Sequence, residues 1–221
     1  MPKKPSSGDV IKEYVKQIVV AVFLAILIRA TLVQAYHIPS GSMEDTFLEG
    51  DYVLGDKLTF GTQVPDRLPI LNLKLPSFRM PGFRDPQQGD LVIFEYPKDE
   101  SRDFIKRCVA VAGQTVEIKN KAVYVDGKPF ENPDGVKYED PRIVPRRYGQ
   151  RDNFGPYTVP PGNIFVLGDN RDSSHDSRFW GTVSLDKVKA HPWFIYYSWD
   201  SNRPIWNVLT KIRWGRLGFV N

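Results

Sequence analysis

The sequence has one cysteine, Cys108, so no disulfide can form within the chain and neither a Cys-x-x-Cys pair nor a thiolate zinc site is available. The zinc-protease pattern His-Glu-x-x-His is also missing, which excludes that class of metalloprotease. Lysine and arginine are spread along the chain rather than clustered, so the formal net charge of +4 does not favour a nucleic-acid partner. Internal repeats and low-complexity tracts are absent.

The composition is otherwise that of a chain able to bury a core. Of 221 residues, 41% are hydrophobic and 25% are charged, which excludes collagen-like, coiled-coil and wholly disordered classes. The length suits one main domain with an appendage. One segment departs from this composition, because residues 18–28 are apolar at every position.

We expect residues 14–36 to form a transmembrane anchor. A bilayer core of about 30 Å needs roughly 20 helical residues, and this segment reaches that length if Lys16 and Arg29 extend toward the interfaces. Four lysines precede the apolar run, whereas Arg29 is the only basic residue between it and Lys57. The positive-inside rule therefore predicts that residues 1–13 are cytoplasmic and residues 37–221 extracytoplasmic.

Two other interpretations of this segment stay open. It is a cleavable signal peptide if Val33-Gln34-Ala35 is a small-residue cleavage site. It is a buried core helix if the rest of the chain covers it, although few soluble helices are apolar on every face.

Beyond residue 36 the pattern changes to the alternation that is typical of strands. We predict strands at residues 51–54, 90–94, 104–111, 115–118, 164–167 and 193–199. Asp126-Gly127 predicts a hairpin turn within residues 123–128, because both residues tolerate positive φ. Residues 61–88 contain five prolines and residues 129–162 are rich in proline, glycine and charge, so we expect variable loops or a lobe at 61–88 and 120–160. The predicted fold class is mainly β and antiparallel.

The first candidate for chemistry is the turn Ile-Pro-Ser-Gly-Ser-Met at residues 38–43. A hydroxyl held in a proline-led turn beside glycine can meet a substrate carbonyl while nearby amides point at the oxyanion. Ser42 is thus a candidate nucleophile. The alternative is a helix cap, because Ser42 and Asp45 have the spacing of a capping box.

The second candidate is Lys106, within the predicted strand 104–111. Strand alternation places Lys106 on one face with Phe104, Cys108 and Ala110 and turns Arg107 the other way. Burial that lowers a lysine pKa by roughly three units, at a cost of about 4 kcal/mol, would make it a base at neutral pH. The alternative is an edge-strand lysine that discourages aggregation.

The third candidate is the polar run at residues 168–181, directly after the apolar strand 164–167. Side chains that donate or accept hydrogen bonds are unusually dense for a mere connection. The simplest alternative is that these residues form a solvated turn. A calcium site from Asp169, Asp172 and Asp176 is another, although the Asp-x-Asp-x-Asp-Gly spacing is missing.

A histidine is the other possible base for Ser42. His175 lies beside Asp176, but neighbouring residues of an extended segment point apart, so this carboxylate could not easily orient the imidazole. The Gly-x-Ser-x-Gly pattern of hydrolases does not surround Ser42 either. We therefore favour Lys106.

The C-terminal residues 193–221 carry four of the five tryptophans, with arginine and lysine interleaved. This pattern suits a lipid headgroup interface, and packing within core strands explains it equally well.

Together, residues 38–43 behind an apolar segment, residues 104–113 and residues 168–181 resemble the type I signal peptidases of bacteria, which are membrane-bound Ser/Lys endopeptidases. Their order and spacing match as well. The resemblance extends from about residue 10 to the C-terminus and is weakest at 61–88 and 120–160. It implies an antiparallel β-sheet catalytic domain of signal-peptidase type behind one transmembrane helix in the bacterial inner membrane, without a metal or cofactor.

The resemblance also implies roles for individual residues. Ser42 is the implied nucleophile and Lys106 the implied general base. The Ser40 hydroxyl and the backbone N–H of Ser42 would hold the oxyanion, and Ser174 would orient the lysine. Structural support of that loop would come from Asp176 and Arg178. The positions that would line pockets for small substrate side chains are Ile38, Met43, Phe47, Phe104 and Ile105.

Asp45 departs from the family pattern, since many members have proline there, so the turn after the nucleophile is expected to differ. The implied partners are membrane lipids and the signal peptides of exported preproteins, cut at small-x-small sites, and we expect a monomer. A self-cleaving repressor would carry a DNA-binding module in place of the apolar segment. A non-catalytic, membrane-anchored binder of exported polypeptides would not need Ser42, Lys106 and Ser174 together.

Overall fold

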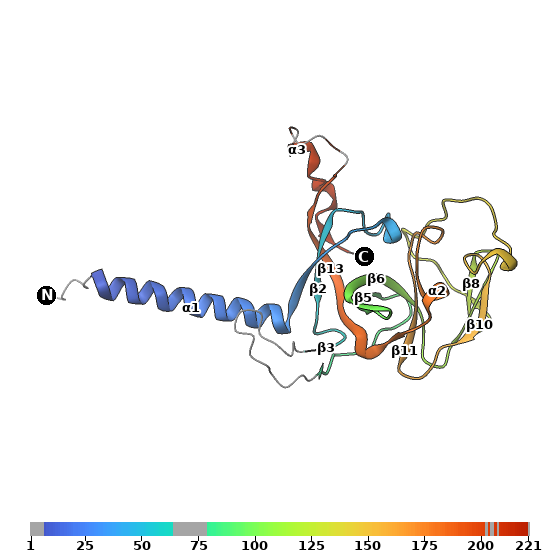
Figure 1. Cartoon of the computed structure of the whole chain (residues 1–221), viewed down its shortest axis with the longest axis horizontal. Coiled ribbons are helices and arrows are strands. Elements are labelled where there is room, and N and C mark those ends of the chain that lie inside the picture. Colours follow the sequence, from blue (N-terminus) through green and yellow to red (C-terminus); the bar gives the residue numbers. More distant parts are fainter. Residues whose placement is uncertain (1–6, 64–78, 202, 204–205, 207, 221) are drawn as a thin grey trace.

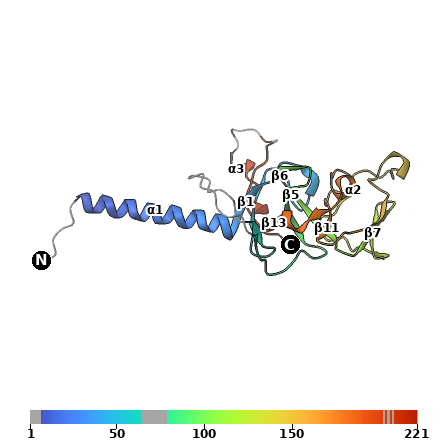
Figure 2. The same cartoon turned by 60° about the horizontal axis from the view of Figure 1, so that its bottom comes forward.

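The computed structural model describes residues 7–63, 79–201, 203, 206 and 208–220. Helix α1 (Ser7–Thr31) projects away from a β-rich body, as two views show (Figures 1 and 2). The remaining helices are short, α2 (Ser177–Trp180) and α3 (Val208–Lys211), with single 3-10 turns that include η1 (Gly41–Met43). The strands are β1 (Val33–His37), β2 (Asp51–Asp56), β3 (Thr62–Gln63), β4 (Arg79–Met80), β5 (Leu91–Tyr96), β6 (Asp99–Val111), β7 (Thr115–Lys119), β8 (Ala122–Val125), β9 (Lys128–Pro129), β10 (Phe154–Thr158), β11 (Asn163–Leu167), β12 (Val183–Ser184), β13 (Val188–Ser198) and β14 (Gly218–Phe219).

Every pairing between these strands is antiparallel. The main sheet has the order β1-β2-β13-β5-β6-β11-β12, with β14 added to β13. A second sheet has the order β10-β7-β8-β9, and β3 pairs with β4. The predicted mainly antiparallel β class is confirmed. The hairpin between β8 and β9 turns at Asp126 and Gly127, whose φ values are 51° and 75°, as their tolerance of positive φ predicts.

Strand β11 explains how the two sheets share a core. Ile164 and Val166 pack into one cluster with β5 and α2, whereas Phe165 and Leu167 pack into another with β7 and β8. All four side chains are buried. Because both faces of this strand are covered, its sequence is continuously apolar rather than alternating.

Helix α1 ends earlier than the predicted anchor. Its last residue is Thr31, and β1 starts at Val33 and pairs with β2 from Val33 opposite Asp56 to His37 opposite Tyr52. Val33-Gln34-Ala35, the possible cleavage site, is therefore part of the main sheet. No described helix meets the length and apolarity of a membrane span. Many large apolar side chains of α1 are exposed, including Ile11, Val15, Ile18, Val19, Val22, Phe23, Leu27 and Ile28.

Both predicted variable regions contain strands. The ends of the 61–88 segment form the β3–β4 pair, while residues 64–78 lie outside the described residues. The 120–160 segment supplies three of the four strands of the second sheet.

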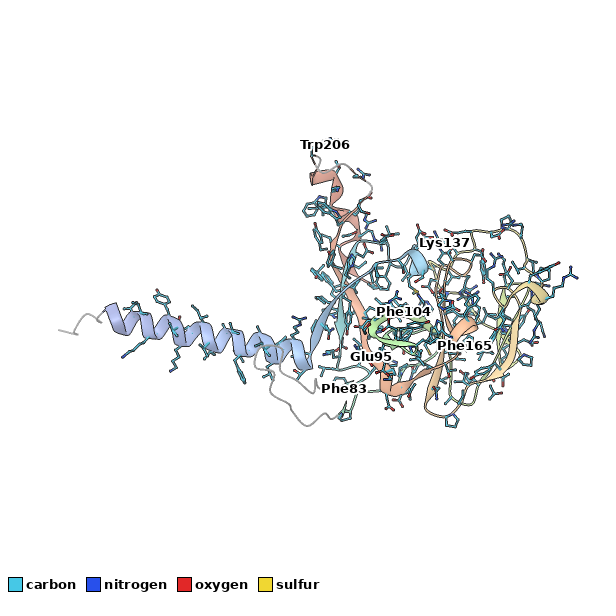
Figure 3. All side chains as sticks on the ribbon, viewed as in Figure 1. Phe83, Glu95, Phe104, Lys137, Phe165 and Trp206 are labelled. Carbon is cyan, nitrogen blue, oxygen red and sulfur yellow. The ribbon has the colours of Figure 1, made fainter. Side chains whose placement is uncertain are left out.

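The C-terminal tryptophans divide between the two interpretations of that region. Trp193 packs against Phe219 on β14 with ring centroids 5.5 Å apart, so it belongs to the sheet. Trp206 and Trp214 are 87% and 59% exposed, which excludes core packing for these two. Trp206 lies near the tip of the arm that carries α3 (Figure 3).

Candidate active site

The turn that carries Ser42 is held from outside by the loop after β11. The backbone N–H of Asn170 donates to the Ser42 carbonyl at 3.2 Å, and Asn170 Nδ2 donates to the Gly41 carbonyl at 3.3 Å. Ser42 lies inside η1, and the N-cap of that turn, Ser40, makes no side-chain cap bond. The capping-box alternative for Ser42 therefore does not hold.

Asp45, which follows this turn, has a φ of 78°. Proline cannot adopt that conformation, because its ring fixes φ near about −65°. Proline in place of Asp45 is therefore incompatible with the turn that this chain forms after Ser42.

Lys106 meets Ser42 from β6. Its Nζ lies 2.5 Å from Ser42 Oγ, with the ammonium as donor in the protonated form. The lysine is only 3% exposed, and Nζ is 5.6 Å from the centroid of the Phe104 ring. β6 brings the lysine here from the middle of the main sheet, where it pairs with Val92 of β5.

Burial lowers the pKa of Lys106 from 10.5 to about 8, because the charged form loses its hydration. Asp176 and Asp169 oppose this effect, since their carboxylates favour the ammonium, and Arg178 adds to it. With this pKa, about one lysine in ten is neutral at pH 7 and able to take a proton from Ser42.

The alternation predicted along β6 holds only in part. Phe165 pairs with Ala110 and Val166 with Cys108, so Val109 is an extra residue in this strand. Cys108 packs into the cluster that contains Val166, while Val109 and Ala110 both pack into the cluster that contains Phe165. The prediction that Lys106 shares a face with Ala110 is wrong for this reason.

Arg107 is also buried, in an ion pair that sequence analysis did not identify. Its Nε and Nη2 donate to the two carboxylate oxygens of Asp169 at 2.9 and 2.7 Å, and both residues are at most 4% exposed. Asp169 also accepts from Thr46 Oγ1 at 2.6 Å, and its backbone N–H points to Met43 Sδ at 3.4 Å. The pair thus links β6, the loop after β11 and the residues that follow Ser42.

Ser40 lies beside the nucleophile candidate. Its Oγ is 3.5 Å from Ser42 Oγ, and either hydroxyl can be the donor. Both serines line the same cleft, so a carbonyl that approaches Ser42 also approaches the Ser40 hydroxyl.

Ser174 is buried close to the same turn. It is 6% exposed, and its Oγ has no hydrogen-bond partner among the described residues. A Cβ added at Gly168 would lie 2.2 Å from Ser174 Oγ and 2.5 Å from the Ser42 carbonyl oxygen. Glycine at position 168 therefore allows the loop and the Ser42 turn to pack together. The structure shows no bond between Ser174 and Lys106.

Asp176 and Arg178 hold the loop in shape. The Asp176 side chain caps α2, accepts from the Gly168 backbone N–H at 3.1 Å and pairs with Arg178 at 2.8 Å. Arg178 also donates to the carbonyls of Arg171 and Arg151 at 2.6 and 2.7 Å. Both members of the pair are buried, where loss of one partner would leave an uncompensated charge.

A cleft of about 490 Å³ lies over Ser42 and Lys106. Four of the five predicted pocket residues line it: Ile38, Met43, Phe104 and Ile105. Phe47 is not part of its lining. It is fully buried in a core cluster with Val53 and Leu91, so the prediction that it contacts substrate is wrong. His175 lines the cleft, and its Nε2 lies 3.5 Å from the Tyr96 hydroxyl.

Comparison with known proteins gives consistent matches. The family model described as "Signal peptidase, peptidase S26" matches residues 11–197. A probable signal peptidase I-1 of Synechocystis is 31% identical over 97% of this chain and 90% of its own length. Signal peptidase I of Pseudomonas aeruginosa is 33% identical over 84% and 68%, and that of Aquifex aeolicus is 31% identical over 81% and 83%.

A signal peptidase I from Enterococcus faecalis, known from a crystal structure, aligns with 49% of this chain and 97% of its own, at 30% identity and a TM-score of 0.40. The family model and the relatives in sequence cover most of the chain. The chain therefore belongs to the signal peptidase family, peptidase S26.

Proposed function

We propose that this peptidase removes signal peptides from exported preproteins at small-x-small sites, with Ser42 as nucleophile and Lys106 as general base. The observation that carries the proposal is the contact between Lys106 Nζ and Ser42 Oγ under the cleft. Burial of the lysine supplies the neutral amine that a base requires.

In the proposed reaction, neutral Lys106 takes the Ser42 proton as Oγ attacks the scissile carbonyl. The tetrahedral intermediate collapses when the lysine ammonium gives that proton to the leaving amine, and an ester between Ser42 and the N-terminal part of the substrate remains. Water, deprotonated by the same lysine, then attacks the ester. The Ser42 oxygen regains a proton and the free carboxylate of the signal peptide departs.

The Ser40 hydroxyl and the Ser42 backbone N–H are the donors that we assign to the oxyanion. Pre-aimed donors of this kind are worth about 3 kcal/mol each in the transition state. We assign Ser174 to the orientation of Lys106. A buried hydroxyl without a partner is costly, and a bond from its Oγ to Nζ would remove that cost.

The walls of the cleft beside Ser42 are packed tightly against the core. We therefore expect them to admit only small substrate side chains before the cut. Ile38 and Met43 are at most 5% exposed although they line the cleft. Phe104 is fixed by stacking on Tyr96, with ring centroids 4.5 Å apart. Packed walls exclude large side chains sterically, which agrees with a small-x-small preference.

We further propose that α1 crosses the bacterial inner membrane once, with the N-terminus cytoplasmic and the monomeric catalytic body extracytoplasmic. Support comes from the exposed apolar side chains of α1, such as Val19 and Phe23 at 61% and 64%, and from the exposed Trp206 and Trp214, which suit headgroups. Protease added to spheroplasts should digest the body and spare an N-terminal tag. Digestion of the tag with the body intact would contradict this topology.

The proposed activity is tested with the full-length, detergent-solubilised chain and a peptide that carries an Ala-x-Ala site. Ser42→Ala and Lys106→Met should abolish cleavage, while His175→Gln should retain it. Folded wild type that binds the peptide without cutting it would instead support a non-catalytic binding protein. Cleavage that survives Lys106→Met and is lost in His175→Gln would identify a histidine base.

A further inference from the structure

The cleft has a second wall beyond the predicted pockets. Glu44 follows the Ser42 turn, and Glu139, Asn170 and Ser173 come from two loops of the second half of the chain, and all four line the cleft. An endopeptidase must hold its substrate on both sides of the cut. Because we assign the pockets around Ile38 to the N-terminal side of the substrate, this second wall is available to the residues that follow the cut.

The hollow continues outward from this wall. A second depression of about 470 Å³ shares Glu139 and Ser173 with the cleft and is lined beyond them by Pro141 and by the paired charges of Asp140, Arg142, Arg151 and Asp172. The two depressions adjoin at Glu139 and Ser173, and we call the surface that they line beyond Ser42 the acidic groove, after Glu44 and Glu139 where it begins. An extended chain that leaves the active site by this route meets Glu139 as it passes from one depression to the other.

Negative charge exceeds positive charge at the start of this groove. Lys137 Nζ lies 3.2 Å from Glu44, 3.7 Å from Asp45 and 3.2 Å from Glu139, so one ammonium faces three carboxylates. Lys137 lies beside the η1 turn (Figure 3). Glu44 Oε2 is 3.4 Å from the position that a Cβ on Gly41 would occupy, which places this carboxylate against the Ser42 turn.

Glu139 is fixed and ionised. Ser173 Oγ donates to it at 2.9 Å, and the bonds from Ser173 and Lys137 lower the pKa of Glu139 below its ordinary value. The side chain of Glu139 is 44% exposed, so its charge faces any chain in the groove.

We propose that the acidic groove binds the first residues after the cut and selects against acidic side chains there. This inference rests on the proposed function, because it assumes cleavage at Ser42. A carboxylate of the substrate would be repelled by Glu44 and Glu139 in the lining, to which the neighbouring Asp45 adds, whereas an amide would not be repelled and an ammonium would be attracted. Specificity of this kind depends on repulsion of the wrong substrate as much as on attraction of the right one.

The test compares peptides that are identical up to an Ala-x-Ala site and carry Asp, Asn or Lys at the second position after the cut. At low salt, kcat/KM for the Asn peptide should exceed that for the Asp peptide by about fivefold. The ratio should fall toward one at about 1 M salt, where exposed charges are screened.

Two variants of opposite charge change test the cause. Glu139→Gln should lower the Asn-to-Asp ratio, and Lys137→Gln should raise it, because the first removes a negative charge from the groove and the second removes its ammonium. Glu100→Gln is the matched control. Glu100 also pairs with a lysine, Lys187, at 2.5 Å, but it is not part of the groove lining. The Asn-to-Asp ratio of kcat/KM in Glu100→Gln should therefore equal that of the wild type.

The outcomes distinguish a failure of this inference from a failure of the proposed function. Equal cleavage of the Asp and Asn peptides at low salt, or a ratio that neither Glu139→Gln nor Lys137→Gln changes, would overturn this inference and leave the proposed function intact. Failure of the folded wild type to cut any of the peptides would overturn the proposed function and this inference with it.

Discussion

The pH dependence of cleavage follows from the burial of Lys106. Its pKa is about 8 instead of 10.5. A change of pH between 6 and 10 therefore titrates the Lys106 ammonium. Below pH 8 each unit of pH removes about nine tenths of the neutral lysine. We predict that kcat/KM rises about tenfold from pH 7 to pH 9, with an inflection near 8 and a plateau above it.

The magnitude of the effect at neutral pH is large. A lysine with a pKa of 10.5 would be neutral in about 0.03% of molecules at pH 7, against about 9% for a pKa of 8. Burial therefore raises the competent fraction by about 300-fold, which corresponds to about 3 kcal/mol. The same energy is a cost to the folded state at neutral pH.

The assay is the initial rate of peptide cleavage at constant ionic strength and at peptide concentrations far below KM, so that the rate reports the free enzyme. His175→Gln is the control, because His175, like His37, is a histidine that lines the cleft. Its inflection should stay near pH 8. A wild-type profile without pH dependence, or an inflection that disappears in His175→Gln, would refute the assignment of Lys106 as the base.

Three further predictions concern single side chains. Ser40→Ala should lower kcat about 100-fold with little change in KM, since the lost donor acts on the oxyanion; a change in kcat below about twofold would contradict its assignment. Asp169→Asn should lower the free energy of unfolding by about 3–5 kcal/mol in urea titrations, because it leaves Arg107 buried without a carboxylate, whereas the exposed Asp134→Asn should not. Lys106→Leu should be inactive yet more stable than wild type by about 3 kcal/mol at pH 7. Because the folded pKa of Lys106 lies below its unfolded pKa, the ammonium destabilises the fold fully below pH 8 and progressively less up to 10.5, so unfolding measured across that window should show this gain disappear.

Local patterns were enough to predict most strands and the main chemical candidates. Alternation identified β2, β5, β6 and β7, and the Asp126-Gly127 turn identified the β8–β9 hairpin. The proximity of Ser42 and Lys106 was implied by the family resemblance rather than by spacing. The structure brings them together through the pairing of β6 with β5 in the centre of the main sheet.

The features that could not be predicted from the sequence depend on packing between segments that are far apart in the chain. Asn170 bonds to Gly41 and Arg107 to Asp169 across 129 and 62 positions of the chain, and no local pattern reports such a separation. The bulge at Val109 reverses the faces of β6 after Cys108, which strict alternation cannot foresee. Phe47 is apolar and close to Ser42 in sequence, but only the fold shows that it points into the core.

The most direct test of the account is to find where the substrate's acyl group goes. An activated ester of an Ala-x-Ala peptide, mixed with enzyme and quenched in acid, should give a mass increase equal to the acyl part, mapped by peptide digestion to Ser42. Lys106→Met should show no such adduct at pH 7 on the same timescale. An adduct on any other residue, or an equally fast adduct in Lys106→Met, would contradict the assignment of Ser42 and Lys106 as nucleophile and base.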